Sequence, residues 1–216
     1  MINYSVTLQN LTKTFSRRLI FKNLDAQFSS GNIYGLAGNN GSGKSTLAKI
    51  IAGIISPTSG EVIHKLDETI INSDNLHQHL GFVAPYLILY DEFSAKENLL
   101  HSLSIRGLDA DNERIKELLN RFDLYDRKND LLKGYSSGMK QRIKFIFALI
   151  HNPQLLIFDE PTSNLDSKGK NTVYNIIEEE AKEKLVILAS NEESDLALCK
   201  SIIHVENFRQ LETKSP

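Results

Sequence analysis

A glycine-rich segment that ends in a lysine and two hydroxyl residues has the residue types and spacing for phosphate chemistry. It reads GNNGSGKST and fits the pattern G-x-x-x-x-G-K-[ST]. Its glycines allow the backbone to curl and point N–H groups at phosphate oxygens, while Lys44 can reach the terminal phosphates and Ser45 can offer a hydroxyl to Mg²⁺. We expect the whole segment to bind a nucleoside triphosphate: Gly38, Asn39, Asn40, Gly41, Ser42, Gly43, Lys44, Ser45 and Thr46.

Two neighbouring segments support this interpretation. An apolar strand, Ile33–Ala37, precedes the loop, and a helix is predicted from about Ser45, where its positive end would add to an anion site. The apolar residues on one face of that helix are Leu47, Ile50, Ile51 and Ile54. The alternative is a glycine turn that happens to contain a lysine. It would not explain why an apolar strand precedes the turn and an amphipathic helix follows it.

An acidic pair follows the next strongly apolar segment. Leu155–Phe158 is a run of four apolar residues, which is typical of a strand buried on both faces of a parallel sheet. Ligands gather at the carboxyl ends of such strands. There Asp159 can hold Mg²⁺ or its water shell, and Glu160 can orient or deprotonate an attacking water. Alone, the same string is equally typical of a strand that ends in a solvated acidic turn.

The rest of the chain indicates which elements position these residues. Alternating polar and apolar residues predict strands around Tyr4–Leu8 and Leu24–Phe28. Strands then alternate with helices, which predicts an α/β core with a mainly parallel sheet. Further strands are expected at Gly60–Ile63, Gly81–Val83, Leu185–Ala189 and near Ile202–Val205, with a helix at Lys168–Ala181. The helical pattern from Ala95 to about Ile150 indicates an insertion into that core; the alternative is a plain helical bundle.

Composition excludes several classes of protein. The 216 residues are enough for one large domain, and a net charge of -2 gives no general attraction for nucleic acid or acidic lipid. Cys199 is the only cysteine, which excludes an internal disulfide framework and suits a reducing cytoplasm. The first residues lack the layout of a signal peptide, and no apolar run approaches the roughly 18 residues that cross a bilayer.

Two further motifs carry a family resemblance. Residues 135–142 read YSSGMKQR and residues 163–166 read SNLD. Together with the phosphate loop they resemble the ATPase domains of ABC transporters. The motifs are most similar to those of bacterial exporters, including the haem-exporter type. The resemblance covers essentially the whole chain, from Phe15 to the strand before Asn191. It implies a P-loop NTPase core with a mainly parallel sheet, an N-terminal antiparallel β subdomain and an inserted helical subdomain. Residues 1–216 would form one domain, with its core at about 1–84 and 145–216 and the insertion at about 85–144.

The resemblance also implies how the site is completed. Two nucleotide domains of this family meet head to tail, so that one subunit's Ser136, Ser137 and Gly138 press on the γ-phosphate held by the other. Asp166 would help to couple the two sites, and Phe15 would stack on adenine. The serines are good helix caps and Gly138 permits a close backbone approach, but an ordinary capped helix would read the same way. A lone Phe15 is also compatible with a core position.

The chain departs from the family pattern at two positions. Pro85 stands where the family has a glutamine that contacts Mg²⁺ or the water, and proline has no side-chain donor or acceptor. A shift of one residue would offer Tyr86 instead, whereas Gln78 precedes the strand before it. The apolar run Tyr86–Tyr90 either receives a membrane partner or simply packs against the helical region.

The second departure is Asn191, which stands where the family has a histidine. Asparagine can donate a hydrogen bond to a γ-phosphate oxygen but cannot exchange a proton at neutral pH. We therefore expect measurable but slow hydrolysis of ATP in the presence of Mg²⁺, with Glu160, Lys44 and Asn191 as the catalytic residues. Ser45 and Asp159 would be the metal ligands.

The resulting hypothesis is an ATP-binding and ATP-hydrolysing subunit of an ABC transporter. It would work as a dimer on a separate membrane-spanning subunit, on the cytoplasmic face of the cell membrane, without binding nucleic acid. Two alternatives remain: an ATP-gated dimerising module with little turnover, and a non-transport ABC ATPase that acts on ribosomes or DNA. The second nucleotide-binding subunit of the pair is expected to be another copy of the same chain.

Overall fold

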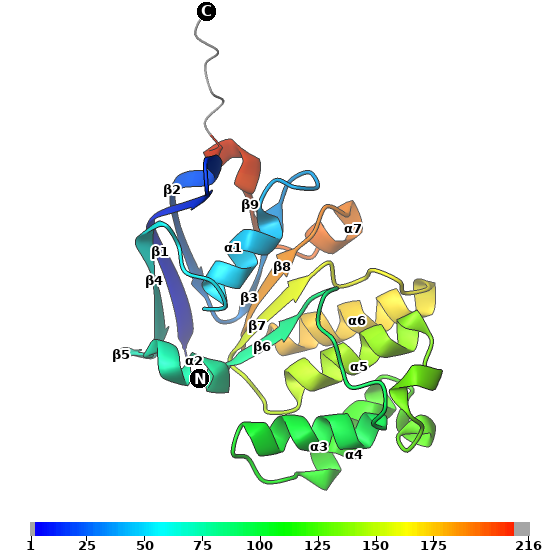
Figure 1. Ribbon diagram of the computed structural model, residues 1–216. Coiled ribbons are helices and arrows are strands. Elements are labelled where there is room, and N and C mark those ends of the chain that lie inside the picture. The colour runs from blue at the N-terminus through cyan, green and yellow to red at the C-terminus, as the bar shows by residue number, and fades with distance from the viewer. Residues whose placement is uncertain (1–2, 210–216) are drawn as a thin grey trace, which may run out of the picture.

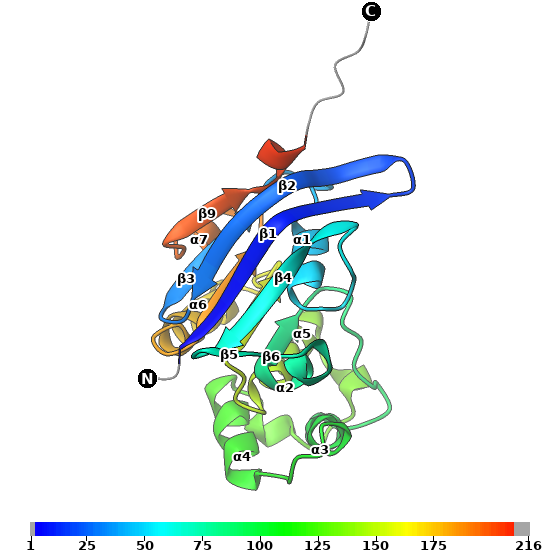
Figure 2. The same cartoon turned by 90° about the vertical axis from the view of Figure 1, so that its left-hand side faces the viewer.

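The computed structural model describes residues 3–209 as two β-sheets with helices between and beside them (Figure 1). The first sheet is antiparallel, in the order β2–β1–β4–β5, and Figure 2 shows these strands side by side. Its strands are β1 Tyr4–Phe15, β2 Arg18–Ser29, β4 Ser59–Leu66 and β5 Thr69–Ile70. The predicted alternation places Tyr4, Val6 and Leu8 on the buried face. The expected antiparallel β-sheet at the N-terminal end is therefore confirmed.

The second sheet is parallel throughout, in the order β6–β7–β8–β3–β9. Its strands are β3 Asn32–Ala37, β6 Leu80–Val83, β7 Leu155–Asp159, β8 Leu185–Ala189 and β9 Ser201–His204. Every residue of β7 and β8 is buried, which accounts for their unbroken apolar sequences. The predicted α/β core with a mainly parallel sheet is confirmed.

This sheet brings the predicted functional segments to one edge. The strands β7, β8 and β3 are neighbours, and Ala189 at the end of β8 is in register with both Leu36 and Asp159. The glycine-rich loop, the acidic pair and the segment that contains Asn191 therefore leave the sheet side by side, at the carboxyl ends of the strands. This is the edge at which ligands bind in sheets of this kind.

Helices cover both faces of the parallel sheet. They are α1 Lys44–Ile51, α2 Leu76–His79, α3 Ala95–Ile105, α4 Asn112–Arg121, α5 Ser137–Leu149, α6 Ser167–Glu180 and α7 Glu193–Leu196. Short 3₁₀ turns lie at Ser73–Asn75, Tyr125–Arg127, Leu132–Gly134 and Val205–Phe208. Helix α1 lies between the two sheets, whereas α5 and α6 cover the other face and α3 and α4 lie beyond them (Figure 1). Among the helices of residues 3–209, none combines the length and apolar character that crossing a bilayer requires.

The region between β6 and β7 is helical, as its sequence indicates, and each of its main helices begins at a capping side chain. Ser94 caps α3 in a reciprocal capping box with Glu97, Asp111 caps α4, and Ser136 caps α5. Apolar side chains of these helices join β7 and β8 in one core. Helix α5 runs without interruption through residue 144, where the prediction placed the end of the insertion.

One detail of the predicted α1 is wrong. The helix ends at Ile51, and Ile54, expected on its buried face, is 53% exposed. The cause is Gly53, whose φ of 70° ends the helix in a left-handed turn and redirects the chain.

Candidate nucleotide-binding site

The glycine-rich loop curls tightly around the first turn of α1. Gly38 and Gly43 have φ values of 144° and 110°, and a Cβ on Gly43 would lie 2.5 Å from Cγ2 of Ile20. Only glycine allows both this conformation and this approach to β2. Gly43 is also the N-cap of α1 and gives the helix no capping side chain. The first N–H groups of α1 are therefore free of a side-chain acceptor and favour an anion.

Lys44 lies inside the curl with little access to solvent. Its side chain is 5% exposed, and its ammonium donates to the carbonyl oxygens of Gly38, at 2.8 Å, and Asn39, at 3.4 Å. The nearest carboxylate oxygen belongs to Glu160, at 3.9 Å. A buried ammonium whose nearest carboxylate oxygen is 3.9 Å away can still attract a phosphate strongly, because little water screens its charge. The side chain of Asn39 donates instead to Glu206, so this residue contributes its backbone to the curl.

A second corner of the site is made of hard oxygen atoms. The Ser45 hydroxyl donates to Oδ1 of Asp159 over 3.0 Å, and Asp159 is 1% exposed. Burial raises the pKa of Asp159, while the hydrogen bond from Ser45 and the charges of Lys44 and Lys49 oppose that rise. Oxygen ligands of this kind suit Mg²⁺, which typically takes one or two protein ligands and completes its shell with phosphates and water. The residues present therefore fit the metal.

Glu160 faces the same space from the end of β7. Its backbone has a φ of 51°, and its N–H donates to the carbonyl of Ala189 over 2.8 Å, which fixes the residue after the strand. Burial raises the pKa of Glu160, Lys44 lowers it, and the neighbouring carboxylates Asp159, Asp195 and Glu192 raise it further. A carboxylate whose pKa lies nearer neutrality is a stronger base for a water molecule.

Eight of the predicted residues line one cavity of about 450 Å³. Its lining comprises Phe15, Arg18, Ile20, Asn40, Gly41, Gly43, Lys44, Ser45, Thr46 and Glu160. Phe15 is 48% exposed, which excludes the alternative of a core position, and Lys13 lies 4.7 Å from its ring centroid. Sequence reasoning missed Arg18 and Ile20, because they reach the cavity from β2 of a hairpin and follow no motif.

The residues of the YSSGMKQR segment lie outside the lining of this cavity. Ser136 caps α5 by accepting from the N–H of Met139, and both Ser136 and Ser137 are exposed. A Cβ on Gly138 would lie 3.2 Å from the carbonyl oxygen of Asn164, which explains the need for glycine there. A single chain therefore presents these residues at its surface, free to meet another molecule.

Two links in this region were not anticipated from the sequence. Gln141, 3% exposed, donates to the carbonyl of Pro161 over 3.2 Å and so ties α5 to the residue after Glu160. Asp166 is the exposed N-cap of α6 and accepts from the N–H of Gly169. Asp166 therefore stabilises the start of α6 within its own subunit, in addition to any role between subunits.

Asn191 follows β8 on a loop that is fixed by hydrogen bonds between buried side chains. Its side chain is exposed, whereas the preceding Ser190 is fully buried and donates to Asp195 over 2.6 Å. Asp195 also accepts hydrogen bonds from Thr162 and Tyr174. No sequence motif predicts this network, because its donors come from separate elements.

Comparison with known proteins agrees with this geometry. A family model described as ABC transporter matches residues 21–163, which include the glycine-rich loop, the YSSGMKQR segment and the acidic pair. The chain belongs to the ABC transporter family. The resemblance found in the sequence is thereby confirmed.

Several ABC proteins are similar over nearly the whole chain. The lipoprotein-releasing system ATP-binding protein LolD of Leptospira interrogans is 34% identical over 99% of this chain and 93% of its own length. The lantibiotic transport ATP-binding protein SrtF of Streptococcus pyogenes is 35% identical over 85% of this chain and 78% of its own length. The dimeric structure of a bacterial ABC transporter cassette superposes with a TM-score of 0.80 at 25% identity, over 93% of this chain and 95% of that chain.

The first departure from the ABC pattern has a clear structural setting. Pro85 is exposed, and its carbonyl accepts from Lys144 of α5 over 2.8 Å. Gln78 lies in α2 at the amino end of β6, the opposite end from the site, so it does not take the place of the family glutamine. Tyr86, the alternative by a shift of one residue, lies beside Lys49 of α1.

Proposed function

We propose that this ABC ATPase hydrolyses MgATP between two subunits closed head to tail, and that it drives a membrane-spanning partner from the cytoplasmic face. The observation that carries the proposal is the incomplete site of a single chain. Phe15, Lys44, Ser45 and Glu160 line one cavity, whereas the signature residues Ser136 and Ser137 are exposed elsewhere and Gly138 beside them is half-buried. The dimeric cassette with the same fold supports the pairing.

Each group in the cavity has a task in such a reaction. The curl and Lys44 would bind the phosphates, and Phe15 would hold the base. Ser45 and Asp159 would hold Mg²⁺, which neutralises charge on the phosphates. Glu160 would orient a water and take its proton. Ser136 to Gly138 of a second subunit would cover the open side and add the positive end of α5.

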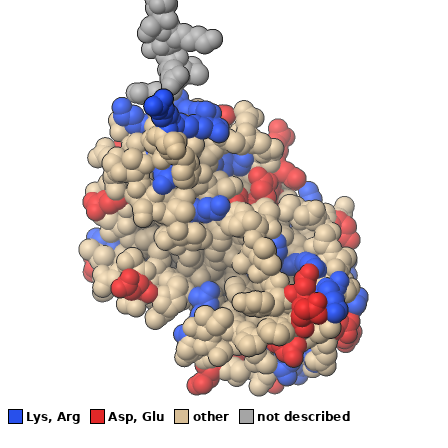
Figure 3. Space-filling model, viewed as in Figure 1, with Lys and Arg blue, Asp and Glu red and all other residues tan. Residues whose placement is uncertain are grey.

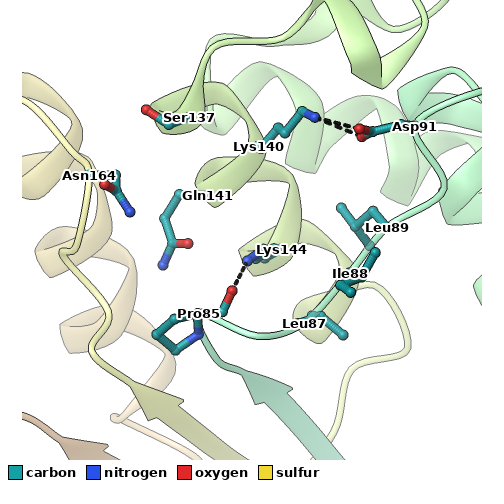
Figure 4. A pocket seen from close by; sticks show the side chains of 10 residues that line it. All are labelled: Pro85, Leu87, Ile88, Leu89, Asp91, Ser137, Lys140, Gln141, Lys144 and Asn164. Carbon is teal, nitrogen blue, oxygen red and sulfur yellow. Dashed lines mark hydrogen bonds and ion pairs between the residues drawn. The ribbon is translucent and has the colours of Figure 1, made fainter.

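A separate groove supports the proposed membrane partner. A cavity of about 280 Å³ lies between the loop after β6 and α5, lined on one side by Leu87, Ile88 and Leu89 (Figure 4). Ile88 is 89% exposed, which argues against the alternative that this run only packs against the helical region. The ion pair between Lys140 and Asp91, at 2.7 Å, closes one end of the groove (Figure 4). An exposed apolar strip of this kind is typical of a protein–protein contact.

Charge favours a specific contact over general attraction. On the face shown in Figure 3, basic atoms gather at the top, whereas acidic and basic atoms are mixed over the helical part at the lower right. Within the region between β6 and β7, Lys133 pairs with Glu92 and Arg127 with Asp130. Because these charges neutralise each other locally, apolar contact in the groove would decide the partner.

Co-purification tests the proposal directly. Tagged Glu160→Gln protein, incubated with ATP and detergent-solubilised membranes of the source cell, is expected to retain a multi-span protein. The variant Ile88→Glu should lose it, because a charge would enter the apolar groove, whereas Ile105→Glu, at an exposed isoleucine of α3 outside the groove, should retain it. Retention of ribosomes or DNA instead of a membrane protein would favour the non-transport alternative.

Asn191 stands where the ABC pattern has a histidine, and we infer that it slows the chemical step without removing it. We expect Asn191→His to raise kcat by about tenfold, because histidine can exchange a proton near neutral pH, and to leave the KM for ATP almost unchanged. The exposed side chain leaves room for the larger ring. Steady-state kinetics would measure both constants, with Asn175→His on α6 as the control. Equal changes in kcat and KM would contradict a role for this position in the chemical step.

A further inference from the structure

An arginine of the β1–β2 hairpin lines the nucleotide cavity and has no part in the reaction described so far. Arg18 is the first residue of β2 and pairs directly with Phe15, the last residue of β1, across a two-residue loop. Figure 2 shows this hairpin along one side of the antiparallel sheet. Directly paired residues of neighbouring strands lie on the same face of a sheet, and both of these line the cavity. Arg18 is therefore a neighbour of the ring that would stack on the base.

Strand β2 continues the cavity lining from this ring to the phosphate loop. Ile20, two residues after Arg18, also lines the cavity. The pairing of β1 with β2 shifts register at this point, a bulge that lets both Ile20 and Phe21 face Gly43. A Cβ on Gly43 would lie 2.5 Å from Ile20 and 3.7 Å from Phe21. Along the lining, Arg18 thus lies between Phe15 and the phosphate loop.

The guanidinium of Arg18 is available to a ligand. It is exposed, and within residues 3–209 it forms no ion pair or hydrogen bond. The other nearby cations have partners or lie elsewhere. Lys13 donates to the carbonyl of Ser56 over 2.7 Å, and Lys44 donates to carbonyls of the curl. Arg17 is exposed outside the cavity lining. The cavity therefore has a second positive group besides Lys44, with its donors facing open space.

We propose that Arg18 binds the α-phosphate of the nucleotide and so contributes to the affinity for ADP as well as for ATP. In a nucleotide the ribose and α-phosphate connect the base to the terminal phosphates, and Arg18 lies between Phe15 and the loop that carries Lys44. Ribose has no charge, whereas a phosphate can accept two charge-assisted hydrogen bonds from the guanidinium fork. This inference rests on the proposed binding of ATP in this cavity.

Calorimetric titration of ATP and ADP tests the inference, with Glu160→Gln as the parent and EDTA present so that metal contacts do not contribute. Arg18→Met is expected to weaken the binding of both nucleotides by the same factor, about tenfold, because both carry the α-phosphate. Arg18→Lys should keep part of the affinity, since it retains the charge but loses the fork. Lys44→Met should instead weaken ATP more than ADP, because its ammonium would lie at the terminal phosphates.

Inorganic triphosphate distinguishes a contact with phosphate from a contact with the base. Arg18→Met should weaken its binding, whereas Phe15→Leu should leave it unchanged. The matched control is Arg17→Met, which removes the adjacent exposed arginine outside the lining and should bind ATP, ADP and triphosphate like the parent. Without ligand, the Tm of both arginine variants should equal that of the parent, because neither guanidinium bonds to another residue within 3–209.

Three results would overturn the inference alone. In Arg18→Met they are unchanged affinity for all ligands, a larger loss for ATP than for ADP, and a loss confined to the nucleotides with triphosphate binding intact. The second would place the guanidinium at the terminal phosphates, and the third would place it at the base or ribose. Failure of the parent to bind ATP would overturn the proposed function as well.

Discussion

Replacing Glu160 with glutamine is expected to lower the steady-state rate of ATP hydrolysis by about 10²–10⁴-fold, with ATP binding retained. Glutamine keeps the size of the side chain but not its charge, and it cannot accept a proton from water. The backbone of residue 160 is fixed by its hydrogen bond to Ala189, so the substitution leaves the end of β7 in place. Loss of the base without loss of the phosphate curl should trap the closed dimer, which size-exclusion chromatography with ATP would detect.

The pH dependence of the wild-type rate gives a second readout. Since burial and nearby carboxylates raise the pKa of Glu160, the base becomes protonated at a higher pH than a free glutamate, whose pKa is about 4.3. Turnover should therefore fall as the pH is lowered through that raised value. Glu192→Gln removes a charge that raises this pKa, so its activity should extend to lower pH.

Glu192→Gln is also the matched control for the loss of rate. Glu192 is an acidic neighbour that pairs with Lys170 at 2.8 Å, and its amide variant should keep turnover near neutral pH. If Glu160→Gln hydrolyses ATP as fast as the wild type, the proposed base lies elsewhere. If both variants lose activity equally, the loss would come from removing a negative charge near the site and not from removing the base.

The parts of the site that the sequence predicts are those whose conformation is dictated locally. The curl at residues 38–46 needs glycine at positive φ, and β7 and β8 need unbroken apolar runs, so each leaves a direct trace in the sequence. Because these strands are parallel neighbours, the functional residues at their carboxyl ends lie at the same edge of the sheet.

The parts that the sequence does not predict depend on contacts between distant elements. Arg18 reaches the cavity from β2, and Gln141 of α5 holds the carbonyl of Pro161; neither contact follows from a local period. The predicted helix α1 extends too far, to Ile54, because the spacing of apolar residues does not indicate the turn at Gly53. The contact between the Tyr86 ring and Lys49 likewise joins two distant elements and follows from no local pattern.

The loop after β6 joins the groove to the phosphate site. The loop after β6 has its apolar residues in the groove at one end and Tyr86 against α1 at the other. Lys144 fixes the loop to α5, the helix whose N-cap is Ser136. A partner seated in the groove would therefore contact a segment tied to both halves of the proposed composite site.

Replacing Lys44 with methionine is expected to weaken ATP binding by at least about 100-fold. The ammonium is 5% exposed, and its nearest counter-charge, Glu160, lies 3.9 Å away. A hydrogen bond to a charged group contributes about 1.5–3 kcal/mol, and the terminal phosphates would lose more than one of these. Isothermal titration of ATP into the Glu160→Gln protein and into its Lys44→Met derivative measures the difference.

The control for this variant is Lys49→Met, which removes the lysine one turn and a little further along the same helix. It should bind metal-free ATP like its parent, because Lys49 contacts Tyr86 and lies outside the cavity lining. Lys44→Met also leaves the carbonyls of Gly38 and Asn39 without their donor, so its unfolding free energy is expected to fall by about 1–3 kcal/mol.

The rise in Tm on adding ATP separates binding from folding, since it compares each variant with itself. Lys44→Met should show almost no rise, whereas Lys49→Met should show the full one. A full rise in Lys44→Met would mean that the triphosphate is held without the buried ammonium. The curl around α1 would then be a structural turn, and the chemistry assigned to its neighbours Ser45, Asp159 and Glu160 would lose its substrate.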